Sequence, residues 1–122
     1  MELQSYFNTH EGTGVLATAN CEGDVDAAIY AIPHMVDDAT IGLIMRPRRS
    51  YQNLQTNPKA TYLFIEKGPG YKGVRLYLKK TGEEKDIDKI NALRRSHHGG
   101  DEASAALVYF TVELIRPLVG DA

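Results

Sequence analysis

Short apolar runs separated by turn residues are the feature of this sequence that most constrains its fold. Six runs have the length of a β-strand, whereas only one segment, residues 86–96, has the periodicity of a well-formed helix. The absence of a regular alternation between strands and long helices disfavours a doubly wound parallel sheet. Six mostly antiparallel strands instead predict a closed or nearly closed β-barrel. The runs are residues 14–19, 25–32, 41–46, 60–66, 74–80 and 107–115.

A few short helices accompany the predicted strands. The first covers residues 3–10. The second begins near Ser50, a favourable N-cap residue, and ends at the Asn-Pro pair of residues 57–58. The third, residues 86–96, has an apolar stripe, acidic residues in its first turn and arginines in its last turn, as the helix dipole prefers. The sequence therefore predicts a mainly β fold with small helices at its periphery.

Size and charge exclude several classes of protein. The chain of 122 residues has the usual size of one domain, so we expect residues 1–122 to form a single domain. A formal net charge of −2 argues against a dedicated nucleic-acid binder. The apolar runs are too short to cross a bilayer, and the polar N-terminal segment is unlike a signal peptide. We expect a cytoplasmic protein with neither nucleic acid nor membrane as a partner.

Three arginines within residues 46–49 interrupt this near-neutral chain. Arg46, Arg48 and Arg49 lie between the predicted strand 41–46 and the helix that begins near Ser50. The first backbone N–H groups of a helix have no partner within the helix, and their partial positive charge adds to that of the guanidinium groups. Guanidinium groups bind phosphate through paired hydrogen bonds. The pattern is therefore suited to phosphate binding.

The residues alone leave other interpretations of this basic cluster open. A solvated basic turn needs no ligand, and by itself it is the more common explanation. The arginines could also pair with the acidic residues of segment 82–88. A nucleic-acid patch would need aromatic side chains among the basic ones, and only Tyr51 is near. Composition and spacing do not choose between these and a phosphate site.

No other group of side chains has the spacing of a metal or catalytic site. His10 and His34 lie in separate segments. His97 and His98 are adjacent, so a regular element cannot direct both into one site, and the predicted helix end suits an imidazole. The single cysteine, Cys21, excludes an intramolecular disulfide and lies in a turn without an activating neighbour. We therefore predict no metal site and name no catalytic residue.

Three stretches give the chain a resemblance to a known family. They are residues 14–30, 41–66 and 68–80. The first is similar to an opening hairpin with a polar turn, and the second to a strand, a phosphate loop, a helix and a further strand. Together they resemble the pyridoxamine 5'-phosphate oxidase-like, FMN-binding split-barrel family, over about residues 3–116. The resemblance implies a six-stranded antiparallel split β-barrel.

The same resemblance implies a homodimer with FMN bound at the subunit interface. Arg49 and Ser50 match the phosphate-binding pair at the helix start. The family often has Arg-Lys there, so Arg46 or Arg48 would supply the missing charge. Two strand segments and a helix position would lie along the cofactor, and Arg75 would approach from the partner subunit. The cofactor-binding positions implied are Ala28, Ile29, Tyr30, Ile44, Met45, Arg46, Arg48, Arg49, Ser50, Asn53 and Arg75.

The function expected from the resemblance is that of a flavoprotein. FMN would carry the redox chemistry, and the protein would act as an oxidoreductase on an unidentified small substrate or as an electron carrier. Pyridoxamine 5'-phosphate is not the expected substrate, because the C-terminal segment after residue 115 lacks an arginine and histidine pair for a second phosphate. Two alternatives remain: a haem-binding split barrel, and a non-enzymatic module that binds another phosphorylated ligand.

Overall fold

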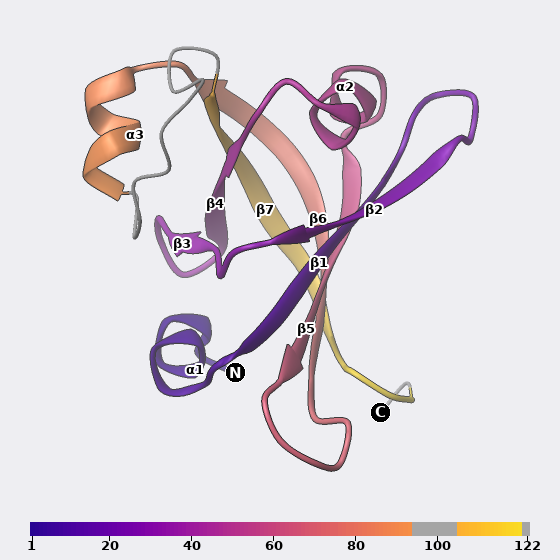
Figure 1. The fold of residues 1–122 in the computed structure, drawn as a ribbon, viewed down its shortest axis with the longest axis vertical. Helices are drawn as coiled ribbons and strands as arrows, with labels where there is room; N and C mark the ends of the chain where they lie inside the picture. The colour runs from indigo at the N-terminus through magenta and orange to yellow at the C-terminus, as the bar shows by residue number, and fades with distance from the viewer. Residues whose placement is uncertain (94–104, 121–122) are drawn as a thin grey trace.

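The strands of this protein form one curled antiparallel sheet. Within residues 1–93 and 105–120, which the computed structural model describes, seven strands follow the order β2-β1-β5-β6-β7-β4-β3 (Figure 1). β2 and β3 are therefore the two edges. The strands are β1 (Gly12–Ala19), β2 (Val25–Tyr30), β3 (His34–Met35), β4 (Thr40–Met45), β5 (Lys59–Glu66), β6 (Gly73–Glu84) and β7 (Ala106–Pro117).

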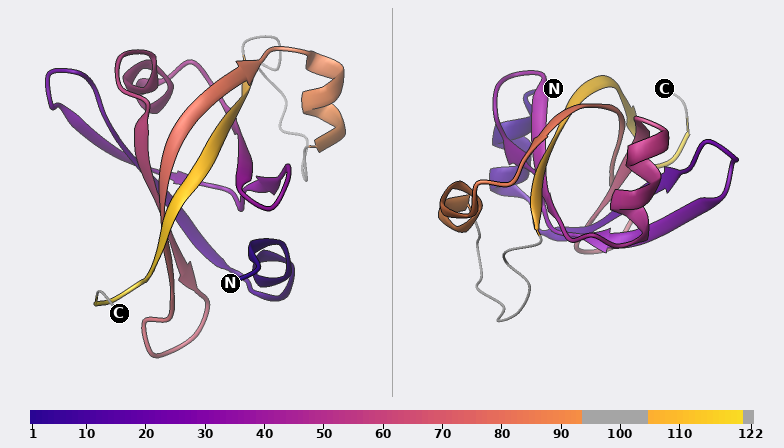
Figure 2. Two further views of the ribbon diagram at one scale, coloured as in Figure 1. Left: turned by 180° about the vertical axis from the view of Figure 1, so that it is seen from behind. Right: turned by 90° about the horizontal axis from the view of Figure 1, so that it is seen from above.

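Three helices lie outside the curl in the described part of the chain: α1 (Leu3–Thr9), α2 (Arg49–Thr56) and α3 (Ile87–Leu93). α1 and α3 lie on one side of the sheet and α2 on the other (Figure 2). The Asp86 carboxylate accepts hydrogen bonds from the N–H groups of Asp88 and Lys89, which fixes the start of α3. None of the described helices is long and apolar enough to cross a membrane.

The hydrophobic core lies inside the curl. Alternate residues of each central strand point inward, so Leu16, Tyr62 and Leu76 are fully buried although their strand neighbours are not. α1 contributes Phe7, whose ring lies perpendicular to that of Phe64 with 5.3 Å between centroids. Burial of these side chains is the main source of stability for so small a sheet.

β6 and β7 produce much of the curvature. Each spans 12 residues, and their register shifts between Tyr77 and Leu78 and again between Lys80 and Gly82. Such irregularities bend a strand and increase its twist. The start of β6 pairs with β5 and its last residues pair only with β7, so the sheet closes towards β4. The result is the half-barrel seen in Figure 2.

The mainly β split barrel predicted from the sequence is confirmed, with seven strands rather than six in the described part of the chain. The extra strand, β3, is the two-residue segment after Pro33 that pairs with Gly42 and Ile41 of β4. β6 extends to Glu84, four residues beyond the predicted end, because Gly82–Glu84 pair with β7. The predicted third helix is described only to Leu93. The predictions for Arg94–Ser96 and for His97 and His98 fall outside the described residues.

The outer face of the sheet carries exposed apolar side chains. On β2, Val25 and Ile29 are 80% and 71% exposed. Val15 of β1 lies opposite Ile29 on one side and opposite Leu63 of β5 on the other, so the apolar residues are continuous across three strands. We call Val15, Val25, Ile29 and Leu63 the outer stripe. Val15 and Leu63 are half-buried, whereas the exposure of Val25 and Ile29 is unusual because edge strands commonly carry polar residues on the open face.

Candidate functional site

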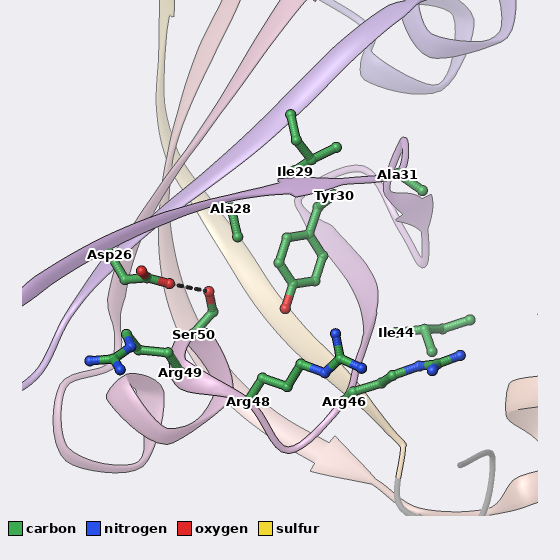
Figure 3. A pocket seen from close by; sticks show the side chains of 10 residues that line it. All are labelled: Asp26, Ala28, Ile29, Tyr30, Ala31, Ile44, Arg46, Arg48, Arg49 and Ser50. Atoms are coloured by element: carbon green, nitrogen blue, oxygen red, sulfur yellow. Dashed lines mark hydrogen bonds between the residues drawn. The ribbon is translucent and has the colours of Figure 1, made fainter. Parts of the chain in front are cut away.

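A cavity of about 440 Å³ opens between β2, the end of β4 and the start of α2 (Figure 3). Its lining divides into an apolar part, from β2 and β4, and a cationic part, from the bend between β4 and α2. An amphiphilic anion, with one apolar end and one charged end, has the chemistry that such a lining would bind. The lining residues are Asp26, Ala28, Ile29, Tyr30, Ala31, Ile44, Arg46, Arg48, Arg49 and Ser50.

The three guanidinium groups of the bend have no acidic partner in the described structure. Across residues 1–93 and 105–120, no carboxylate lies within ion-pair distance of Arg46, Arg48 or Arg49.

The acidic segment 82–88, which could have neutralised these arginines, forms its hydrogen bonds and ion pairs with other residues. Glu83 accepts from Tyr51 and Lys80, and Glu84 accepts from Lys89 and Tyr109. Pairing of the arginines with this segment is therefore excluded for the described residues.

The start of α2 adds backbone donors to the same part of the cavity. The helix begins at Arg49, and its N-cap residue, Arg48, makes no capping bond through its side chain. The N–H of Gln52 is the first to bond back, to the Arg48 carbonyl at 2.9 Å. The N–H groups of Arg49, Ser50 and Tyr51 therefore precede the helical hydrogen-bond ladder. Such groups, with the helix dipole behind them, favour an anion.

The prediction that Ser50 is the N-cap of this helix is wrong. Ser50 lies inside the first turn, is 3% exposed, and its hydroxyl donates to the Asp26 carboxylate at 3.3 Å. The N-cap is Arg48, two residues earlier, because Arg48 has the extended backbone of an N-cap and its carbonyl already accepts from the N–H of Gln52. Ser50 thus connects α2 to β2 across the cavity instead of closing the helix end.

Tyr30 directs its hydroxyl from β2 towards the arginine-bearing bend (Figure 3). Burial raises the pKa of the Tyr30 phenol, and the Asp26 carboxylate raises it further, whereas a hydrogen bond with Ser50 and the charge of Arg48 oppose that rise. The phenol is therefore protonated at neutral pH. It can donate a hydrogen bond to a ligand that lies between the apolar and cationic parts of the cavity.

Eight of the eleven positions predicted as cofactor-binding line this cavity, and three do not. Met45 is fully buried and faces the core, because side chains alternate along β4 and Ile44 takes the cavity side. Asn53 is buried under α2, where its amide donates to Thr18 at 3.0 Å. Arg75 lies on β6 and donates to the carbonyls of Pro117 and Gly120. A role for Arg75 at a partner's cofactor stays a prediction.

Two lining residues were absent from the predicted set: Asp26 and Ala31. The signal for Asp26 was present, because alternation along residues 25–32 puts it on the same face as Ala28 and Tyr30. The resemblance implied only Ala28, Ile29 and Tyr30 from this segment, so Asp26 was not in the predicted set. The described residues contain no cluster of three or more metal-ligating side chains.

Comparison with known proteins supports the fold through structure alone. No protein-family model matches the sequence, and no curated protein matches it significantly. An FMN-binding protein from Syntrophomonas wolfei subsp. wolfei superposes with a TM-score of 0.76 at 21% identity, over 98% of this chain and 85% of that one. An F420 reductase gives 0.71 at 15% identity, over 87% and 90% of the two chains.

A third solved structure shares the same architecture. A protein from Lactobacillus delbrueckii, described as a candidate pyridoxamine 5'-phosphate oxidase, gives a TM-score of 0.70 at 15% identity, over 93% of this chain and 88% of that one. Identities in this range establish a shared fold. The chain therefore has the split-barrel fold of these proteins over nearly its whole length.

Proposed function

We propose that this protein binds FMN in the cavity between β2, β4 and α2, and that it acts as an oxidoreductase on a small substrate or as an electron carrier. The observation that carries the proposal is the set of three guanidinium groups without acidic partners beside an apolar wall. FMN has the same two parts as this lining, because it carries a flat apolar ring system at one end and a phosphate at the other. Sharing a fold with an FMN-binding protein supports this choice of ligand.

The net charge of the cavity fits one phosphate monoester. Three guanidinium groups and the single carboxylate of Asp26 leave two net positive charges. A phosphate monoester carries roughly −1.5 to −2 at neutral pH, so one such group would neutralise the lining. In this proposal Arg48, Arg49 and the first N–H groups of α2 hold the phosphate, each through a charge-assisted hydrogen bond.

The apolar part of the cavity would hold the ring system. Ala28 and Ile44 supply apolar surface, and the protonated Tyr30 supplies a donor between that surface and the arginines. Arg46 lies close to Ile44 and would place a positive charge near the ring. Bound FMN would supply the redox chemistry, so the protein's own side chains need only bind, orient and exclude water.

A homodimer is part of the same proposal. Val25 and Ile29 of the outer stripe are exposed in one chain, and Ile29 also belongs to the cavity lining. A second copy that covers the stripe would bury this apolar surface and would bring Ile29, one wall residue of the cavity, to the subunit interface. Ile29→Asp should convert two-chain particles into single chains in sedimentation. Val119→Asp, at an equally exposed position outside the stripe, should not. Single chains for the unaltered protein would reject the dimer.

The test of FMN binding is a titration of the purified protein with FMN and with riboflavin. Riboflavin has the same ring and ribityl chain but no phosphate, so the difference in affinity isolates the cationic part of the cavity. FMN should bind at least roughly a hundredfold more tightly, because several charge-assisted bonds are lost with the phosphate. Equal affinities would reject the phosphate assignment, and no binding of either would reject the function. Co-purification of haem would favour the haem alternative.

The choice of substrate has its own test. Pyridoxamine 5'-phosphate should not be turned over at an ordinary enzymatic rate, because the net positive charge of the cavity matches one phosphate, which FMN would occupy. The measurement is oxygen consumption with that substrate after loading with FMN. Normal turnover would show that the cavity serves as a vitamin-B6 oxidase site.

A further inference from the structure

A carboxylate lies inside the cationic cavity. Asp26 of β2 lines the cavity together with all three arginines of the bend, and its side chain is half-buried. It accepts a hydrogen bond from the hydroxyl of Ser50, at 3.3 Å. Figure 3 shows Asp26 and Ser50 pointing towards each other from opposite walls, between β2 and the first turn of α2.

The bonding of Asp26 does not neutralise its charge. No ion pair joins it to Arg46, Arg48 or Arg49 among the residues that the structure describes. Its hydrogen bond comes from a neutral hydroxyl and is long for an O–H donor. The negative charge therefore acts on whatever anion the guanidinium groups bind, at the low effective dielectric of a half-buried site.

Support of α2 is the competing explanation for Asp26. A carboxylate near a helix N-terminus interacts favourably with the helix dipole. A capping carboxylate would accept from a backbone N–H of the first turn, and Asp26 accepts from a side chain instead. The hydroxyl of Ser50 already donates its proton to the Asp26 carboxylate, so this neutral donor is not available to a phosphate in the cavity.

We propose that Asp26 is a specificity-determining residue that weakens binding in proportion to the negative charge of the ligand. It competes for the Ser50 hydroxyl and repels the bound anion, so it tunes the cavity to one phosphate monoester and against more highly charged ligands. This inference rests on the proposed function for its flavin ligands, but its ionic basis can be tested with inorganic anions.

Asp26→Asn tests the proposal because asparagine keeps the shape and an acceptor oxygen while removing the charge. FMN should bind roughly tenfold more tightly to the variant, since a unit charge acting on a dianion is removed. Riboflavin affinity should change less than twofold. Inorganic pyrophosphate should gain more than inorganic phosphate, as its charge is larger. Fluorescence titration measures the flavins and calorimetry the inorganic anions.

Glu22→Gln is the matched control, because it removes the same formal charge from the β1–β2 hairpin at an exposed position outside the cavity. It should leave all four affinities within twofold of the unaltered protein. Thermal unfolding of each variant verifies folding. If Asp26→Asn does not fold, Asp26→Ala, which also releases the Ser50 hydroxyl, provides the same comparison among ligands.

Two results would overturn the proposal. Equal changes for FMN and riboflavin would show that Asp26 contacts the part of the ligand that both share, or only supports α2. Weaker binding of phosphate and pyrophosphate would show that Asp26 organises the cationic site instead of opposing it. If the unaltered protein binds neither flavin, the proposed function fails, while the inorganic anions still decide the role of Asp26.

Discussion

Two groups of charged side chains lie on either side of the first turn of α2, and they are built in opposite ways. On the cavity side, Arg46, Arg48 and Arg49 have no acidic partner among the described residues. On the other side, Tyr51 donates to Glu83 at 2.5 Å, and Lys80 lies 3.3 Å from the same carboxylate. Glu84, Lys89 and Tyr109 continue this paired network along β6, α3 and β7.

The difference separates charges that stabilise the fold from charges that, in the proposed function, bind a ligand. Paired charges satisfy one another and hold α2 and α3 against the sheet. Three like charges within residues 46–49 repel one another, and this repulsion opposes folding unless an anion neutralises it. Groups kept in such an unfavourable arrangement commonly mark a functional site. Ser50 and Tyr51, neighbours in sequence, belong one to each region.

The largest expected effect concerns the unpaired region. Arg49→Ala should weaken FMN binding roughly ten- to a hundredfold, because it removes a charge-assisted phosphate contact worth about 1.5–3 kcal/mol. The free energy of unfolding should be unchanged or slightly higher, since a repulsive charge is removed. Fluorescence titration and urea unfolding measure the two quantities. Lys72→Ala removes an exposed cation elsewhere and serves as control. Unchanged FMN affinity in Arg49→Ala would contradict the assignment of Arg49 to the phosphate.

The paired region should show the reverse behaviour. Glu83→Gln weakens the bonds to Tyr51 and Lys80 and should lower the free energy of unfolding by about 1 kcal/mol. FMN affinity should stay within twofold, because Glu83 does not line the cavity. Urea unfolding gives the stability. A variant with unaltered stability but impaired FMN binding would reverse the roles assigned to the two regions.

A smaller effect is expected from pH, through Tyr51. The hydrogen bond to Glu83, followed by burial, raises the pKa of Tyr51 to about 12 from its ordinary value of 10.0. Because the pKa of Tyr51 is raised, the hydrogen bond of the Tyr51 phenol contributes fully to the free energy of unfolding below pH 10. This contribution is lost as the pH rises towards 12. Stability should therefore fall more steeply over this range in the unaltered protein than in Tyr51→Phe. If stability fell with pH equally in the unaltered protein and in Tyr51→Phe, the hydrogen bond of Tyr51 would not stabilise the fold.

The smallest effect is expected from an exposed pair outside both regions. Lys59 lies 2.6 Å from Glu113, and both side chains are largely open to solvent. Lys59→Ala should change the free energy of unfolding by less than about 0.5 kcal/mol, because solvent screens such a pair. The same unfolding measurement applies. A loss as large as that of Glu83→Gln would show that partial burial is not what distinguishes the stabilising network.

The sequence predicted those parts of the fold that depend on local pattern. Alternation of apolar residues located the main strands, and Asn57 with Pro58 located the end of α2. β3 could not be predicted, since two residues contain no periodicity. The last residues of β6 are polar and were not recognised as a strand. They are extended because β7 pairs with them, which is a tertiary effect.

The sequence predicted the cationic residues of the candidate site, but not the hydrogen bond that connects its two walls. The arginine cluster and the β2 segment Ala28–Tyr30 could be placed in one cavity through the resemblance, and the structure brings them together. The bond between Ser50 and Asp26 spans 24 residues and depends on how α2 packs on β2, so no local pattern reveals it. The exposure of Val25 and Ile29 likewise follows from the position of β2 at the edge of the sheet.

The decisive measurement for the proposed FMN site is a crystal structure of the protein with FMN. We expect the phosphate within hydrogen-bond distance of the Arg48 or Arg49 guanidinium and of a backbone N–H in the first turn of α2. We also expect the ring system against Ala28 and Ile44. A phosphate bound elsewhere, with the bend between β4 and α2 directed into solvent, would contradict the proposed site.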